Sequence, residues 1–105
     1  MGESAQVVNV ASRHRYEVVV DGKIAGYVTY VEQDGAVVLE HTRIKVAFEG
    51  RGLGAVLVAG ALADIRERGL SVVALCPFVA SWMQRNPQFD DLVDHDLRER
   101  LVETA

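Results

Sequence analysis

Residues 48–58 read FEGRGLGAVLV, in which three glycines at alternate positions lead directly into an apolar, helix-forming segment. The glycines at positions Gly50, Gly52 and Gly54 let the backbone turn sharply and leave its N–H groups accessible to another molecule. The segment Leu53–Arg68 has the length of a helix, and no Ser, Thr, Asp or Asn precedes it to cap its first turn. The stretch therefore predicts either an anion site, above all for a phosphate, or a glycine-rich turn whose donors bind water.

Length and composition indicate one ordinary domain over residues 1–105. The net charge of -4 argues against nucleic acid as a partner. Cys76 is the only cysteine, so we expect no disulfide framework, no metal site and a cytoplasmic location. No apolar run reaches membrane-spanning length, and Gln6 stands where a myristoylation signal has Ser or Thr, so we expect no membrane attachment.

Strands are predicted on both sides of the glycine loop. Two Asp-Gly turns, at 21–22 and 34–35, separate three apolar runs that we expect to pair as an antiparallel meander: Tyr16–Val20, Ile24–Glu32 and Ala36–Ile44. After the helix, Ser71–Leu75 reads as a buried strand reached through a helical crossover, hence parallel to the third strand. The remainder holds short helical pieces, separated at Asn86-Pro87, with Val93, Leu97 and Leu101 at helical spacing. The predicted fold class is α/β (α+β).

Strict alternation along the third strand assigns its side chains to two faces. It predicts Val37, Leu39, His41 and Arg43 on one face and the residues between them on the other: Val38, Glu40, Thr42 and Ile44. His41 thus shares a face with core residues.

Two other phosphate-binding motifs fit the sequence less well. Gly50, Gly52 and Ala55 satisfy the dinucleotide fingerprint G-x-G-x-x-A, but that fingerprint follows the first strand of a parallel sheet, whereas antiparallel hairpins come first here. The strand after the helix also ends in Leu75-Cys76, without the acidic residue that holds a ribose. The nucleoside triphosphate loop needs a Lys after its glycines, and none is present.

The order of strands, glycine loop and helix resembles the GNAT superfamily of N-acetyltransferases. The loop of that superfamily has Gln or Arg, two variable residues, Gly, one variable residue, and then Gly or Ala. Gly52 and Gly54 match the two small positions, and Glu49 stands where Gln or Arg is usual. A short, single-domain branch of the superfamily is similar over most of the chain, through HTRI at 41–44, FEGRGLG at 48–54 and CPFVASWMQRNPQF at 76–89.

The resemblance implies a protein that binds acetyl coenzyme A or coenzyme A, with the pyrophosphate on the glycine loop and a lid after the last strand. In the lid, an aromatic residue covers the pantetheine arm and Arg85 reaches a phosphate. The cofactor-binding residues that it implies are Ile44, Gly50, Arg51, Gly52, Leu53, Gly54, Ala55, Cys76, Phe78, Trp82, Arg85 and Asn86.

Cys76 and His41 are the candidate catalytic residues, because each lies towards the end of a strand that flanks the crossover helix. Pro77 suits the first position of a helix, which would put the Cys76 thiol at a helix N-terminus. Three roles remain open for it: a nucleophile activated by His41, a general acid to the coenzyme A thiolate, or an inert buried thiol. His41 is either a base or a hydrogen-bonded core residue.

The leading function is an acetyl-CoA-dependent acyltransferase acting on the amine of a small molecule or protein. The alternative is a module that binds coenzyme A or an acyl-CoA without turnover. The acidic run Asp90, Asp91, Asp94 and Asp96 either attracts a cationic amine or forms a solvated helix start. The sequence leaves the acceptor and the oligomeric state open.

Overall fold

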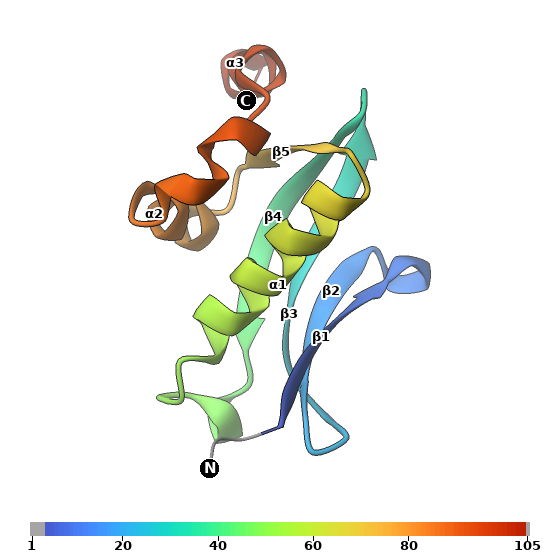
Figure 1. The fold of residues 1–105 in the computed structure, drawn as a ribbon, viewed down its shortest axis with the longest axis vertical. Coiled ribbons are helices and arrows are strands. Elements are labelled where there is room, and N and C mark those ends of the chain that lie inside the picture. Colours follow the sequence, from blue (N-terminus) through green and yellow to red (C-terminus); the bar gives the residue numbers. More distant parts are fainter. Residues whose placement is uncertain (1–3, 105) are drawn as a thin grey trace.

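A single five-stranded sheet organises the protein, in a computed structural model that describes residues 4–104 (Figure 1). The strands lie in chain order, the first four antiparallel and β5 parallel to β4. They are β1 (Ala5–Val10), β2 (Arg15–Val20), β3 (Lys23–Gln33), β4 (Ala36–Ile44) and β5 (Ser71–Ala74). The predicted meander, the crossover and the parallel last pair are confirmed.

The two Asp-Gly turns form as predicted. Asp21 and Gly22 have φ values of 50° and 79°, and Asp34 and Gly35 have 53° and 78°. Two consecutive left-handed residues match the right-handed twist of the paired strands, which is why Asp-Gly is preferred in such turns.

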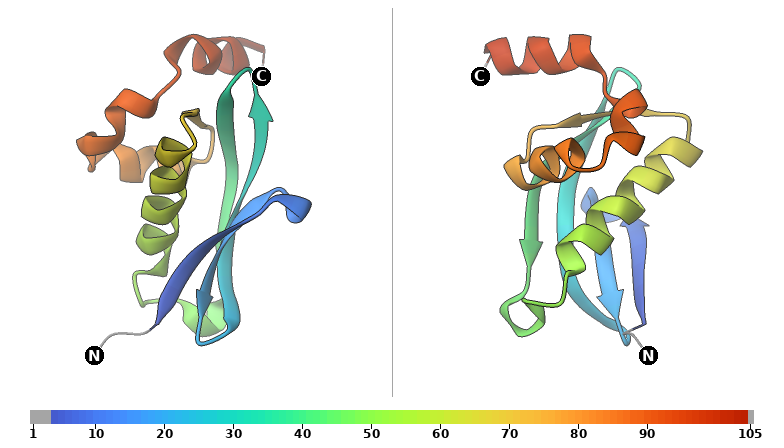
Figure 2. Two further views of the ribbon diagram at one scale, coloured as in Figure 1. Left: turned by 45° about the vertical axis from the view of Figure 1, so that its right-hand side comes forward. Right: turned by 60° about the vertical axis from the view of Figure 1, so that its left-hand side comes forward.

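Helices cover the sheet unevenly (Figure 2). One face is covered by α1 (Leu53–Glu67), and α3 (His95–Thr104) packs Leu97 on the other face against Ala36, Val38 and Val73. The remaining helical elements are η1 (Ala11–Arg13), η2 (Val46–Phe48), α2 (Pro77–Gln84) and η3 (Pro87–Leu92). Within residues 4–104, no helix has the length and apolar character needed to cross a bilayer.

The first strand was not predicted, and it explains the glycine inside α1. A Cβ atom at Gly60 would lie 2.5 Å from Cγ2 of Val7, so only glycine lets α1 approach β1 this closely. The sequence of β1, AQVVNV, gives no clean alternation of apolar and polar residues, and local pattern therefore did not reveal it.

A β-bulge in β4 reverses the predicted faces. Thr29 pairs with His41 and Tyr30 pairs with Leu39, so Glu40 is an extra residue without a partner on β3. Val37 and Leu39 still face the core under α1, but Thr42 and Ile44 now lie on that side as well. The alternation predicted beyond Leu39 is wrong because one inserted residue shifts every later side chain to the opposite face.

Several predicted boundaries differ from the structure by one residue, and Val93 is not helical. β5 ends at Ala74, because the N–H groups of Leu75 and Cys76 both donate to the Leu39 carbonyl at 3.0 Å and the ladder stops there. Val93 was expected at helical spacing with Leu97, but it follows η3 and forms a parallel bridge with Val72 of β5.

Candidate active site

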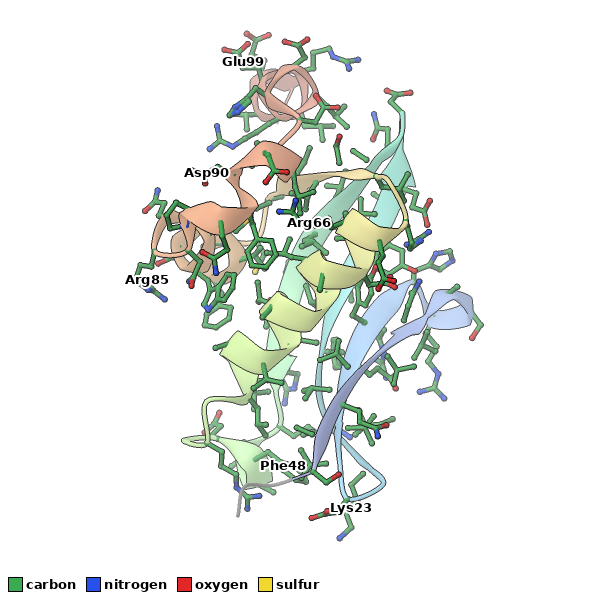
Figure 3. All side chains as sticks on the ribbon, in the orientation of Figure 1. Lys23, Phe48, Arg66, Arg85, Asp90 and Glu99 are labelled. Carbon is green, nitrogen blue, oxygen red and sulfur yellow. The ribbon has the colours of Figure 1, made fainter. Side chains whose placement is uncertain are left out.

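An open groove lies where β4 and β5 separate. It has a volume of about 510 Å³ and lies between the end of β4, the start of α1 and one side of α2. Figure 3 shows Phe48 below the start of α1 and Arg85 at the end of α2. The lining residues are Thr42, Ile44, Phe48, Glu49, Gly50, Gly52, Leu53, Gly54, Ala55, Phe78, Trp82 and Arg85. This size is typical of a small-molecule or cofactor site.

The start of α1 contributes backbone donors to the groove. Gly52 is the N-cap in a left-handed conformation, φ 72°, and Gly50 has φ 80°, so both positions require glycine. No side chain caps the helix, and within residues 4–104 no hydrogen bond is donated by the N–H groups of Leu53, Gly54 and Ala55. These donors and the positive end of the helix dipole together favour an anion at this wall.

The edge of β4 contributes the opposite wall. The N–H of Lys45 donates to the carbonyl of Ala25 on β3 at 2.8 Å. Because successive residues of a strand direct their N–H groups to opposite sides, those of Thr42 and Ile44 point away from β3, to the side where β5 has already ended. This edge can pair with an extended, amide-containing ligand as a missing strand would.

The inner end of the groove holds a hydroxyl and a thiol. The Oγ1 atom of Thr42 lies 3.3 Å from Sγ of Cys76, within hydrogen-bond distance for sulfur. Cys76 is only 4% exposed, and it is the N-cap of α2, with Pro77 at the first helical position as predicted. The thiol therefore lies behind Thr42 and not on the groove surface.

His41 lies on the other face of the sheet. Its side chain is exposed, and it shares that face with Arg43, because the bulge at Glu40 turned both away from α1. In residues 4–104 the thiol of Cys76 has Thr42 as its hydrogen-bond partner and makes no hydrogen bond to His41. The predicted pairing of His41 with Cys76 is therefore absent from this arrangement.

The α2 wall is held by local contacts. Arg85 donates to Ser81 Oγ at 2.9 Å, and Asn86 Nδ2 donates to the carbonyl of Trp82 at 2.7 Å. Phe78 is 42% exposed and lies over the start of α1, where a Cβ on Gly54 would be 2.7 Å from its ring. Gly54 thus makes room for an aromatic ring beside the first turn.

The acidic run has structural partners. Arg66 of α1 donates two hydrogen bonds to the Asp91 carboxylate, at 2.8 and 2.9 Å, and these bonds lower the pKa of Asp91. Asp94 accepts the N–H of Leu97 at 3.0 Å and caps α3. These two carboxylates contribute to the packing of the C-terminal elements, and attraction of a cationic amine by the acidic run stays a prediction.

Most of the predicted cofactor residues come together in the groove, but three do not line it. Arg51 lies with its guanidinium 5.2 Å from the ring centroid of Phe48, Asn86 holds the end of α2, and Cys76 is behind Thr42. Sequence reasoning missed Thr42, Phe48 and Glu49 as lining residues. For Thr42 the decisive signal was the bulge, which has no local signature in HTRI.

A sequence model of GCN5-related N-acetyltransferases matches residues 15–92, which hold β2 to η3 and the whole groove. The chain belongs to the GCN5-related N-acetyltransferase family. A comparison with curated proteins gives no match.

Solved structures share the fold of this GCN5-related protein. A GCN5-like protein from Staphylococcus aureus, solved by NMR, superposes with a TM-score of 0.64 at 16% identity, covering 85% of this chain and 87% of its own. A ribosomal-protein-alanine N-acetyltransferase from Brucella melitensis gives 0.53 at 18% identity, covering 76% and 62%. A GNAT-family protein from Desulfovibrio desulfuricans gives 0.51 at 21% identity, covering 70% and 52%.

Proposed function

We propose that this GCN5-related protein transfers an acetyl group from acetyl coenzyme A to the amine of an acceptor. The observation that supports this most strongly is the groove itself. Its α1 wall offers backbone donors for a pyrophosphate, its β4 wall offers the edge of a strand for the amide-containing arm, and its inner end leads to Thr42 and Cys76. These three features lie in the same order as the pyrophosphate, the amide-containing arm and the thioester of acetyl coenzyme A.

The groove residues fit this donor. Gly50 and Gly52 leave the backbone uncovered, since a Cβ on either would have no heavy atom within 4 Å. Arg85 lines the α2 wall as a cation for a phosphate, and Trp82 supplies an apolar surface for the arm. Glu49 is the acidic residue among the lining side chains, at the exposed rim.

Acetyl coenzyme A supplies a thioester whose carbonyl carbon is attacked by the amine and whose thiolate leaves. In our proposal the Thr42 backbone N–H, on the open edge of β4, donates to the carbonyl oxygen as negative charge develops on it. The hydroxyl of Thr42, which lines the groove, gives a proton to the leaving thiolate and takes one from the thiol of Cys76 behind it. His41, on the opposite face, accepts the proton of the incoming amine.

The test places a negative charge at the start of α1, at a position where the substitution does not strain the backbone. Ala55 is exposed, lies in the first turn of α1 and lines the groove. Ala55→Glu should keep or raise thermal stability, because an acid suits a helix N-terminus, yet weaken coenzyme A binding roughly tenfold or more by repelling the pyrophosphate. Ala55→Gln has the same size without the charge and should bind nearly as the wild type does.

Isothermal titration calorimetry with coenzyme A measures both variants. Ala63→Glu, exposed further along α1 and outside the groove, controls for the change in net charge. Equal affinity in the wild type and Ala55→Glu, or weakening by Ala63→Glu to the same extent, would contradict a pyrophosphate at the start of α1.

The second candidate function is a module that binds coenzyme A or an acyl-CoA without turnover. It is favoured by the separation of His41 from Cys76, which leaves the thiol without an adjacent base. Turnover distinguishes the two: release of free coenzyme A that depends on an added amine supports the transferase, and binding without such release supports the module.

A further inference from the structure

The face of the sheet opposite α1 carries an ordered set of polar side chains. Tyr16, Val18 and Val28 belong to the core under α1, so the residues between them point the other way. Cross-strand pairing aligns them in two rows, Arg15 with Thr29 and His41, and Glu17 with Tyr27 and Arg43. In the described part of the chain, α3 covers this face only near the start of β4, and the rows lie beyond it (Figure 2).

The acidic side chain on this face is paired, whereas the positive charges near the β4 edge are not paired among the described residues. Glu17, which is 5% exposed, is neutralised by Arg15 at 2.8 Å and lies 3.7 Å from Arg13. By contrast, Arg43 and Lys45 are exposed and form no ion pair with any acid in residues 4–104. Two unpaired cations thus lie along the same edge of β4, in a protein whose net charge is -4.

The same edge borders the proposed reaction centre. Thr42 faces the groove, and its neighbours His41 and Arg43 face the open side, so these three consecutive residues connect the two faces of the sheet. Because β5 ends at Ala74, no strand within residues 4–104 closes the space beside Thr42. A molecule on the open face can therefore reach the inner end of the groove past the β4 edge.

Tyr27 and Thr29 add an aromatic ring and a hydroxyl to this surface. The guanidinium carbon of Arg15 lies 4.2 Å from the ring centroid of Tyr27, and the two side chains pack together. Within residues 4–104 the buried hydroxyl of Thr29 has no hydrogen-bond partner, and Thr29 lies directly across from His41. A bound amine that draws His41 inward would give this hydroxyl a partner and orient the imidazole.

We infer that the open face beside His41 binds an acceptor that carries a carboxylate as well as the reacting amine. Arg43 and Lys45 hold the carboxylate, the ring of Tyr27 contacts the carbon chain, and His41 receives the amine at the β4 edge. A carboxylate fits better than a phosphate, because a flat strand face offers side-chain cations but no converging backbone N–H groups. This inference rests on the proposed transferase function.

The inference is tested by binding, so that it does not depend on turnover. The probe is 4-aminobutyrate, and the comparison compound is its uncharged amide. The amine and the carboxylate of 4-aminobutyrate are separated by roughly the distance between alternate residues of a strand, about 6.6 Å. Titration of the ¹⁵N-labelled protein, saturated with coenzyme A, should shift the backbone resonances of residues 27–29 and 41–45. The acid should half-saturate at a concentration roughly tenfold lower than the amide.

Arg43→Gln should remove most of this preference for the acid. Arg98→Gln, an exposed cation on α3, is the matched control and should retain it. Equal titration by acid and amide, shifts confined to other regions, or no effect of Arg43→Gln would overturn the inference. Tighter binding of phosphoethanolamine than of 4-aminobutyrate would overturn the choice of a carboxylate.

A separate set of titrations tests the donor groove and the acceptor surface independently of each other. Coenzyme A is titrated into the wild type without the acid, and 4-aminobutyrate is titrated into the wild type without coenzyme A, so that each surface is measured alone. If coenzyme A binds the groove but the acid shows no preference, only the acceptor surface is wrong. If the acid binds at residues 41–45 but coenzyme A does not bind, only the donor groove is wrong.

Discussion

The hydroxyl of Thr42 and the thiol of Cys76 meet at 3.3 Å, across the point where β4 and β5 separate. Thirty-four residues apart in sequence, they come together because β5 runs parallel to β4 and ends just before the cysteine. The contact gives the buried thiol one defined polar partner in the described structure. The catalytic role proposed for Cys76 is therefore tested most directly by substitution of Thr42.

Cys76→Ala should lower turnover roughly a hundredfold, the usual contribution of a positioned acid, and leave coenzyme A affinity nearly unchanged. Thr42→Val, which keeps the side-chain shape and removes the hydroxyl, should lower turnover by at least the same factor, because the Cys76 thiol reaches the groove only through that hydroxyl. Steady-state rates and calorimetry measure the two effects.

Intact-mass measurement after incubation with acetyl coenzyme A decides between acid and nucleophile. We expect no acetyl adduct on Cys76, because His41 lies on the opposite face and does not contact the thiol. A stable adduct mapped to this residue would establish the nucleophile role, and full turnover in Cys76→Ala would leave the thiol as a core residue only.

Gly54→Ala should weaken coenzyme A binding without loss of stability. The new methyl group would lie 2.7 Å from the ring of Phe78, which is 42% exposed and can turn into the groove to avoid it. Adding Phe78→Ala to this variant removes the obstruction, so the double variant should bind coenzyme A more tightly than Gly54→Ala alone. Calorimetry gives the affinities, and weaker binding by the double variant would contradict this account.

Gly60→Ala should destabilise the protein despite the better helix propensity of alanine. Propensity favours alanine by about 1 kcal/mol, but overpacking against Val7 costs about 1–3 kcal/mol, so we expect a net loss of about 1 kcal/mol. Urea denaturation of Gly60→Ala, Val7→Ala and the double variant measures the coupling. A double variant whose loss equals the sum of the single losses would show that the two sites do not touch.

Alkaline pH should destabilise the fold through Tyr16. Burial, and a hydrogen bond to Asp64 at 2.6 Å, raise the pKa of Tyr16 in the folded protein. A raised phenol pKa gives stability that is fully present below the unfolded value of about 10 and is lost as the pH rises through the folded value. The free energy of unfolding should therefore fall above pH ~10.

Tyr16→Phe is the comparison for this pH dependence. It should cost about 1 kcal/mol at neutral pH, because the Asp64 carboxylate loses a donor but is exposed enough to bind water. Above pH ~10 its stability should fall less steeply than that of the wild type. Parallel curves for the two proteins would assign the alkaline loss to other groups.

The sequence by itself determined the local elements and their order. Asp-Gly pairs set the two hairpin turns through left-handed backbone geometry, the apolar stretch from Leu53 formed the crossover helix, and Pro77 started α2 directly after the cysteine. Each of these features depends on the conformational preferences of neighbouring residues. They were sufficient to predict the parallel pairing of β5 with β4 and the uncapped glycine loop.

Only the tertiary structure decided which side chains share the site. The bulge at Glu40 arises from the pairing of β4 with β3, and that single unpaired residue moved Thr42 to the groove and His41 to the open face. β1 likewise forms because β2 supplies its hydrogen bonds and Gly60 lets α1 pack on Val7, not because AQVVNV favours a strand. The bulge and these close contacts depend on residues distant in the chain, so local periodicity alone did not determine them.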